Sequence, residues 1–157
     1  MYKIKSILFI CTGNSCRSVM AEALMKKYLK EYGKEYISVH SAGISAIDGF
    51  HPTKETVEVL KEAGADIANF RSKRLTAELI KAADLILVME AMHRDFVVNM
   101  APAAAAKTHL LKKFLTDNIA NYPEDSGIPD PIGKPKDYYK LSFEVIKDQI
   151  ERIVRAL

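Results

Sequence analysis

A cysteine and an arginine stand close together near the start of the chain, in a pattern suited to nucleophilic attack on an oxyanion. Residues 11–18 read CTGNSCRS, so five residues separate Cys11 from Arg17. A thiol beside a cationic side chain and a helix N-terminus loses its proton readily and becomes a nucleophile. The planar guanidinium of Arg17 can donate to two oxygens of a phosphate or a similar oxyanion. The segment therefore combines a candidate nucleophile with a candidate clamp for the group under attack.

The sequence on either side predicts the scaffold that these residues need. Residues 4–10 are apolar and rich in β-branched side chains, which is typical of a strand buried on both faces. Residues 19–29 place apolar side chains at helical spacing, and Gly33 follows as a stop signal. Gly13 can adopt a positive φ, which would let backbone N–H groups converge on an anion at the helix N-terminus. A nucleotide-binding loop is not indicated, because the terminal Lys-Ser/Thr pair is missing.

Short apolar runs and amphipathic segments alternate along the rest of the chain. Strands are predicted at 37–39, 84–89 and 109–111, and helices at 53–63, 77–82, 92–100 and 138–154. Residues 101–106 read as a helix end or a loop. This order predicts an α/β fold in which helices cover both faces of a parallel sheet. The proline-rich loop at 116–136 is unusually long for a compact domain, and such loops tend to be functional.

Length and composition exclude several classes of protein. The 157 residues, 48% hydrophobic and 27% charged, fit one domain over 1–157. A net charge of +3 permits anionic substrates but makes no stripe for nucleic acid, and no apolar run suits a membrane helix or a signal peptide. We therefore expect a cytoplasmic monomer or weak dimer that binds neither nucleic acid nor membrane. The two cysteines and four histidines lack metal-ligand spacing, so we expect no metal.

Several segments together resemble a known enzyme family. Residues 7–24, ILFICTGNSCRSVMAEAL, resemble the N-terminal signature of the low-molecular-weight protein tyrosine phosphatases. The similarity extends to residues 41–43 (SAG), to residues 83–89 (ADLILVM) and to the Asp-Pro pair at 130–131. The resemblance implies a flavodoxin-like fold with a four-stranded parallel sheet. It also implies hydrolysis of phosphomonoesters on protein substrates through a phosphocysteine intermediate, with no metal and no other cofactor.

The family's roles can be carried over to matching positions. Cys11 would be the nucleophile, Arg17 would bind the phosphoryl oxygens, and Ser18 would hydrogen-bond the thiolate. Asn14 and Ser41 would hold the loop in a strained shape. The residues implied to bind phosphate are Thr12, Gly13, Asn14, Ser15, Cys16 and Ser18.

A general acid is needed as well, because an ester oxygen leaves poorly unless it is protonated. Residues 11–18 contain no acidic side chain, so the donor must come from elsewhere in the chain. The resemblance assigns this role to Asp130, which would then act as the base that activates water. Asp117 and Asp125 lie in the same long loop and are competing candidates.

Three positions depart from the family pattern. Val19 stands where proline is usual, and we expect little effect because valine can begin a helix. Phe70 occupies the place of a histidine that often supports the loop, which puts that support in doubt. Ile132 and Gly133 stand where aromatic residues flank a phosphotyrosine ring in many members, which weakens the case for tyrosine as the natural substrate.

Other classes of protein share parts of this loop pattern. In the protein-arginine phosphatases, a bacterial branch of this family, the residue before the second loop cysteine is threonine rather than a bulky aliphatic residue, and a glycine stands two positions after the Asp-Pro pair. Here these residues are Ser15, which is also small and polar, and Gly133.

Arsenate reductases that pass a disulfide outward need further cysteines, and this chain has none after Cys16. Phosphocarrier subunits place a cysteine on such a loop but lack an arginine clamp, so Arg17 argues against them. A purely phosphate-binding module would need neither Cys11 nor Asp130, and both are present. Cys16 is either a small packing residue or a thiol that traps oxidised Cys11 as a reversible disulfide.

Overall fold

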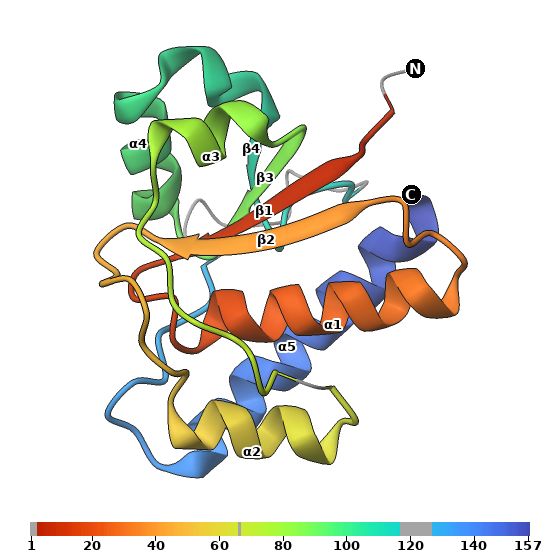
Figure 1. Cartoon of the computed structure of the whole chain (residues 1–157), viewed down its shortest axis with the longest axis vertical. Coiled ribbons are helices and arrows are strands. Elements are labelled where there is room, and N and C mark those ends of the chain that lie inside the picture. Colours follow the sequence, from red (N-terminus) through yellow and green to blue (C-terminus); the bar gives the residue numbers. More distant parts are fainter. Residues whose placement is uncertain (1–2, 66, 117–126) are drawn as a thin grey trace.

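The computed structural model describes residues 3–65, 67–116 and 127–157, and its centre is a parallel sheet (Figure 1). Within those ranges the sheet has four strands in the order β2-β1-β3-β4. Their bounds are β1 (Ser6–Cys11), β2 (Ser38–Gly43), β3 (Leu85–Val88) and β4 (Thr108–Leu110). All three neighbouring pairs run parallel. The predicted α/β fold with a four-stranded parallel sheet is therefore confirmed.

Helices cover both faces of the sheet, as predicted (Figure 1). One face carries α1 (Arg17–Glu31) and α5 (Lys136–Ala156), and α2 (Lys54–Glu62) packs against these two helices. The other face carries α3 (Ala77–Ala82), α4 (Ala91–Met100) and the 3-10 helix η1 (Pro102–Lys107). The stretch expected as a helix end or loop is thus a short helix of its own. Among the described residues, no helix is both long and apolar enough to cross a membrane.

Alternation along β1 gives the molecule two apolar cores. Ile7, Phe9 and Cys11 point toward α1 and α5, whereas Leu8 and Ile10 point toward α3 and α4. All five side chains are buried. A strand enclosed on both faces needs apolar residues at every position, which is the pattern that the sequence displays here.

The second strand is longer than the sequence pattern predicts. The expected strand at 37–39 stops before the small and polar residues Ser41, Ala42 and Gly43, which resemble a turn. These residues instead continue the ladder, with Gly43 paired to Cys11. Backbone pairing with the central strand therefore overrides the local composition of the segment.

The strand order places a crevice for ligands beside the central strand. From β1 the chain crosses to β2 on one side and later to β3 on the other, so the connections at the carboxyl ends of β1 and β3 diverge. In sheets of this kind, ligands bind where the order reverses. The loop that follows β1, which carries the candidate nucleophile, lies at this position.

Candidate active site

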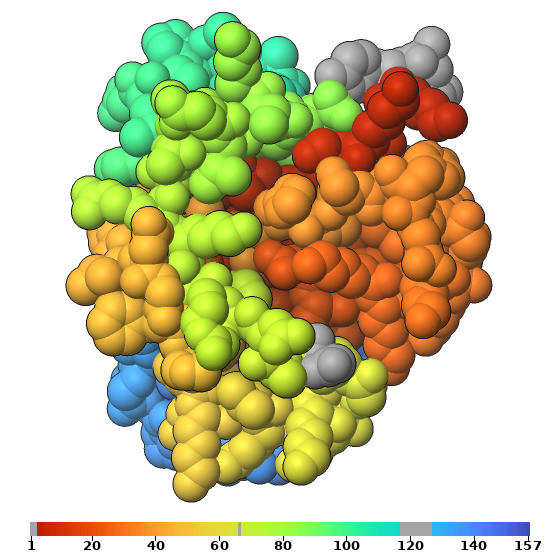
Figure 2. All heavy atoms as spheres, viewed as in Figure 1, coloured from red at the N-terminus to blue at the C-terminus, as the bar shows by residue number. Residues whose placement is uncertain are grey.

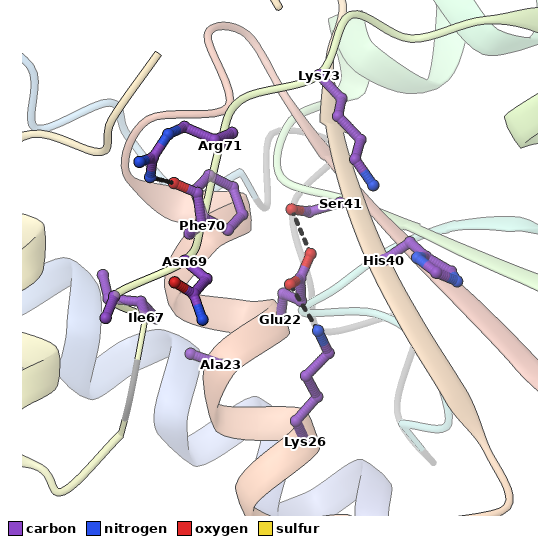
Figure 3. A pocket seen from close by; sticks show the side chains of 11 residues that line it. Glu22, Ala23, Lys26, His40, Ser41, Ile67, Asn69, Phe70, Arg71 and Lys73 are labelled. Carbon is purple, nitrogen blue, oxygen red and sulfur yellow. Dashed lines mark hydrogen bonds and ion pairs between the residues drawn. The ribbon is translucent and has the colours of Figure 1, made fainter. Parts of the chain in front are cut away.

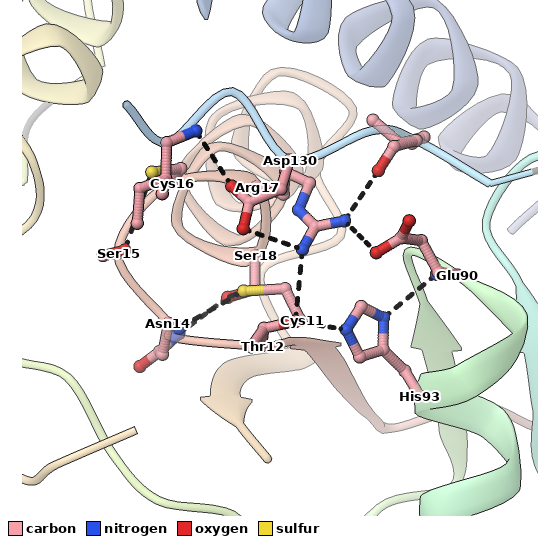
Figure 4. A network of polar contacts seen from close by, with 12 residues as sticks. Cys11, Thr12, Asn14, Ser15, Cys16, Arg17, Ser18, Glu90, His93 and Asp130 are labelled. Atoms are coloured by element: carbon pink, nitrogen blue, oxygen red, sulfur yellow. Dashed lines mark hydrogen bonds and ion pairs between the residues drawn. The ribbon is translucent and has the colours of Figure 1, made fainter. Parts of the chain in front are cut away.

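The loop between β1 and α1, hereafter the first loop (residues 11–18), surrounds the sulfur of Cys11 with hydrogen-bond donors (Figure 4). Cys11 Sγ lies 2.9 Å from Ser18 Oγ and accepts the backbone N–H of Asn14 at 3.3 Å. Ser18 and Asn14 are fully buried. A hydroxyl, an amide N–H and the N-terminus of α1 therefore all stabilise negative charge on this sulfur.

Asn14 holds the loop in its unusual shape. Its φ of 52° lies in the left-handed region, which asparagine enters more easily than most residues. The side-chain amide donates to Ser18 Oγ at 2.7 Å and to Ser41 Oγ at 3.0 Å, while its carbonyl oxygen accepts the N–H of Lys73 at 2.9 Å. Gly13, expected to take the positive φ, is not among the residues that do.

The close approach of β2 requires a residue without a side chain at position 43. A Cβ atom on Gly43 would lie 2.6 Å from the carbonyl oxygen of Thr12 and 2.7 Å from the backbone nitrogen of Asn14. Any side chain would push the first loop away from the sheet. The loop is therefore held both by hydrogen bonds and by close backbone packing.

Support for the loop from behind comes from α1. Ser41 Oγ donates to Glu22 Oε1 at 2.7 Å, and Lys26 pairs with Glu22 Oε2 at 2.9 Å (Figure 3). The yellow-green segment after α2 crosses the surface beside α1 and β2 (Figure 2). It brings Phe70 into a cavity of about 360 Å³ that Glu22 and Ser41 also line. The doubt raised by Phe70 is thus answered, because Glu22 completes the network without a histidine at position 70.

Arg17 is the first residue of α1, and its side chain is buried. One nitrogen, Nη1, donates to Glu90 Oε2 and to the carbonyl oxygen of Ile128, both at 2.7 Å. The other, Nη2, lies 3.4 Å from Thr12 Oγ1 and 3.6 Å from Asp130 Oδ2. The protein therefore fixes one edge of the guanidinium and directs the other edge toward Asp130.

The general-acid candidate reaches the site from the far end of the chain. Asp130 precedes α5, and its side chain is 38% exposed beside the 2% exposed side chain of Arg17. Its Oδ1 accepts the N–H of Ile132 at 3.1 Å, which anchors the carboxylate in its own turn. The structure thus brings Cys11, Arg17 and Asp130 together. The competing candidates Asp117 and Asp125 lie outside the described residues.

Two residues of the site carry no signal in the pattern of the first loop. Glu90 and His93 follow β3, and His93 accepts the Glu90 N–H through Nδ1 at 3.0 Å while its Nε2 lies 2.8 Å from Thr12 Oγ1. Burial, together with the nearby Arg17 charge, lowers the pKa of His93 to about 4. His93, considered from the sequence only as one of four histidines without metal-ligand spacing, is therefore part of the site. Their position just past a buried parallel strand is the signal that could have identified both.

Cys16 faces away from the nucleophile side of the loop. Its Sγ lies 3.6 Å from Thr53 Oγ1 and 3.6 Å from Ser15 Oγ. Burial raises the pKa of the Cys16 thiol. Both cysteines are free thiols in this structure. A reversible disulfide between Cys11 and Cys16 stays a prediction.

Apolar side chains stand on the two segments that attach to the first loop. We call Ile47, Phe50 and Ile132 the rim, and each is more than half exposed. The segment with Ile47 and Phe50 donates backbone N–H groups to Thr12 and Ser15 of the loop. Ile132 follows Asp130 on the other segment. Within the described ranges, no group of His, Cys, Asp or Glu side chains is arranged to hold a metal ion.

Comparison with known proteins agrees with this geometry. The sequence profile described as "Low molecular weight phosphotyrosine protein phosphatase" matches residues 6–157. A protein-arginine-phosphatase of Geobacillus stearothermophilus is 37% identical over 152 residues, which cover 96% of this chain and 95% of the relative. The low molecular weight protein-tyrosine-phosphatase Etp of Escherichia coli K12 is 35% identical over 151 residues, which cover 96% of this chain and 90% of the relative.

A solved structure has the same fold over nearly its whole length. The crystal structure of a low molecular weight protein tyrosine phosphatase from T. tengcongensis matches with a TM-score of 0.87 and 37% sequence identity. The match covers 97% of this chain and 99% of that chain. This chain therefore belongs to the low molecular weight phosphotyrosine protein phosphatase family, whose members are hydrolases that act on phosphorylated proteins.

Proposed function

We propose that this protein hydrolyses phosphotyrosine in proteins through a phosphocysteine intermediate on Cys11. The observation that carries the proposal is the convergence of Cys11, Arg17 and Asp130, which come from β1, α1 and the segment before α5. Arg17 Nη2 lies 3.6 Å from Asp130 Oδ2, directly above the loop that encloses the Cys11 sulfur. A nucleophile, an anion clamp and a carboxyl group on one site are the parts that ester hydrolysis at phosphorus requires.

In the first step, the Cys11 thiolate attacks phosphorus and the bond from phosphorus to the ester oxygen breaks. Asp130, in its protonated form, transfers a proton to that oxygen, so the tyrosine hydroxyl leaves neutral. Arg17 Nη2 and the N–H groups of the first loop bind the phosphoryl oxygens as charge develops on them. The Nη1 contacts with Glu90 and Ile128 keep the guanidinium from rotating away.

In the second step, the Asp130 carboxylate takes a proton from water as the water oxygen attacks phosphorus. The sulfur–phosphorus bond breaks, inorganic phosphate is released, and Cys11 leaves as a thiolate. Ser18 Oγ, 2.9 Å from the sulfur, supports that thiolate by donating a hydrogen bond. Asn14 orients Ser18 for this task, because its amide already donates to the serine oxygen at 2.7 Å.

The rim supports an aromatic substrate. Ile47 and Phe50 present apolar surface that an aromatic ring can cover, which removes that surface from water. Ile132 adds apolar surface but not the aromatic contact that many members of the family have at this position. A second candidate is phosphoarginine, and the residue that favours it is Ser15. This small, polar and half-buried side chain leaves space beside the loop where a bulkier residue would contact the substrate. One relative named above is a protein-arginine-phosphatase.

The test combines a nucleophile variant with two matched substrates. We expect Cys11→Ser to abolish turnover of both phosphotyrosine and phosphoarginine peptides, while calorimetry shows that inorganic phosphate still binds. Chelation of divalent metal should leave the wild-type rate unchanged. Turnover by Cys11→Ser comparable with the wild-type rate would contradict the covalent mechanism. The ratio of the two wild-type activities decides between the two substrates.

The remaining expectations about partners and location stay predictions. They are a cytoplasmic protein, a monomeric or weakly dimeric state, and no binding of nucleic acid or membrane. Gel filtration with light scattering would test the oligomeric state directly.

A further inference from the structure

Both ring nitrogens of His93 contact protein groups, and these contacts determine which nitrogen carries the proton. Nδ1 accepts the backbone N–H of Glu90 at 3.0 Å, so Nδ1 carries no proton. A neutral imidazole has one proton, which must then be on Nε2. Nε2 lies 2.8 Å from Thr12 Oγ1, so His93 donates this hydrogen bond and Thr12 accepts it.

Thr12 Oγ1 accepts from a second donor as well. Arg17 Nη2 lies 3.4 Å from this oxygen, and a guanidinium can only donate. A hydroxyl oxygen has two lone pairs and one proton. With both lone pairs occupied by His93 and Arg17, the hydroxyl proton of Thr12 is left to donate in the remaining direction.

The surroundings of Thr12 indicate where its hydroxyl proton points. Thr12 directly follows Cys11 in the loop, and its hydroxyl contacts the same Nη2 atom that approaches Asp130. Thr12 is only half-buried, whereas His93, whose ring contacts the Thr12 hydroxyl, is fully buried (Figure 4). The hydroxyl proton of Thr12 therefore points into the space beside Arg17 Nη2, where a phosphoryl oxygen would lie.

We propose that His93 is a positioning residue that locks the Thr12 hydroxyl as a hydrogen-bond donor to the phosphoryl group in transfer. This inference rests on the proposed function and adds a donor that the loop pattern does not reveal. The same ring, through Nδ1, ties Thr12 to the start of α4, so β3 and the first loop keep one relative position. His93 is not itself an acid or a base in the reaction, because both ring nitrogens are occupied by protein groups.

The test is a double-mutant cycle that separates the two functions of the ring. His93→Asn keeps an oxygen near the position of Nδ1, which can accept the Glu90 N–H, but loses the donor to Thr12. Thr12→Val keeps the shape of threonine and loses the hydroxyl. Values of kcat and KM are measured with an activated aryl phosphate for wild type, both single variants and the double variant.

We expect Thr12→Val to lower kcat roughly 10- to 100-fold, the effect of one hydrogen bond to a charged group. His93→Asn should lower kcat about 2- to 10-fold, with little change in KM, because the hydroxyl stays but is no longer oriented. In the double variant, the histidine change should add nothing to the loss caused by Thr12→Val. Thr12→Ser, which restores a hydroxyl, should recover most of the activity that Thr12→Val loses.

Independent effects would overturn the proposal. If His93→Asn lowers kcat by the same factor in the presence and absence of the Thr12 hydroxyl, the histidine acts by another route. If Thr12→Val leaves kcat unchanged, the hydroxyl does not contact the phosphoryl group. Thermal unfolding of each variant identifies losses of kcat that are due to misfolding. If His93→Asn does not fold, His93→Gln replaces it in the cycle. Failure here leaves the Cys11→Ser result intact, so it is distinguishable from failure of the proposed function.

Discussion

The first loop and the rim beside it are held in opposite ways. In the loop, Asn14, Ser18 and Arg17 are fully buried, and each makes two or more hydrogen bonds to other parts of the site. In the rim, Ile47 and Ile132 are 68% and 51% exposed and apolar. The loop is thus fixed by directional contacts before substrate arrives, whereas the rim offers surface alone.

This contrast predicts that the first loop determines the rate of phosphoryl transfer and that the rim determines the choice of substrate. A preorganised loop stabilises the charge that develops on any phosphoryl group, so loss of the hydrogen bonds that hold the loop in shape should slow all substrates equally. We expect an exposed rim to contact only the part of the substrate beyond the phosphoryl group, so changes there should alter the ratio between substrates. Asp130 lies between the two regions, because it contacts Arg17 of the loop and precedes Ile132 of the rim.

We expect the largest effect on kcat from a change at Asp130. Asp130→Asn should lower kcat on a phosphotyrosine peptide by roughly 10²- to 10⁴-fold, the usual contribution of a general acid. The loss should shrink sharply on an activated aryl phosphate, whose leaving oxygen hardly needs a proton. Asp117→Asn and Asp125→Asn serve as matched controls and should show neither effect. An equal loss on both substrates would mean that Asp130 holds its segment in place and donates no proton.

The next effect separates the loop from the rim directly. Asn14→Ala removes three hydrogen bonds and places alanine at a φ of 52°, so it should lower the free energy of unfolding by roughly 2–4 kcal/mol. It should also slow phosphotyrosine and aryl phosphate substrates by the same factor. Ile132→Ala should change the free energy of unfolding by no more than about 0.5 kcal/mol. Urea unfolding and steady-state kinetics of both variants check this contrast.

A smaller effect follows from the buried imidazole of His93. Its pKa is about 4 in the folded protein and near 6.5 when unfolded, so between these values the unfolded chain binds more protons. The stability that depends on neutral His93 is therefore fully present at pH 7 and is lost as the pH falls toward 4, by roughly 2–3 kcal/mol. Arg17 opposes protonation, while Glu90 and Asp130 favour it.

Chemical unfolding between pH 4 and 7 measures this slope. Carboxylates titrate in the same range, so the informative quantity is the difference between the wild type and His93→Gln. A variant without the imidazole should lose less stability on acidification. Identical slopes for the two proteins would show that His93 is not held neutral by its surroundings.

The smallest effect concerns the choice between phosphotyrosine and phosphoarginine. Ser15→Ile fills space beside the loop, and we expect it to shift the ratio of kcat/KM values toward phosphotyrosine by roughly tenfold, as a change of pocket shape does. The activated aryl phosphate serves as a control for general damage to the loop. An unchanged ratio would remove Ser15 as the determinant and leave specificity to the rim.

The sequence predicts the parts of the site that are contiguous and fails where contacts join distant segments. Cys11 and Arg17 could be identified because a strand, a loop and a helix follow one another within a few residues. Glu90 and His93 lie more than 70 positions later in the chain, where the sequence predicts only a strand at 84–89 and an ordinary helix at 92–100. They reach Arg17 and Thr12 only because the carboxyl ends of parallel strands lie at the same edge of the sheet. The strand order that brings these ends together cannot be predicted from local periodicity.

Local geometry also corrected two expectations. The sequence favours Gly13 for the positive φ, but Asn14 takes it, because the Asn14 side chain gains three hydrogen bonds in that conformation. The absence of histidine at position 70 suggested weak support for the loop. Glu22, one turn into α1, provides that support through Ser41, a contact that residue spacing alone does not predict.

The most direct test of the central claim is to trap the phosphorylated enzyme. Asp130→Asn is mixed with an activated aryl phosphate, which should phosphorylate Cys11 without a general acid, while hydrolysis stalls for lack of a base. Rapid quenching followed by mass spectrometry of peptides should locate one phosphoryl group on Cys11, and Cys11→Ala, which has no nucleophilic atom at this position, should carry none. An enzyme that turns over with no phosphoryl group on Cys11, or with the group on another residue, would contradict the mechanism.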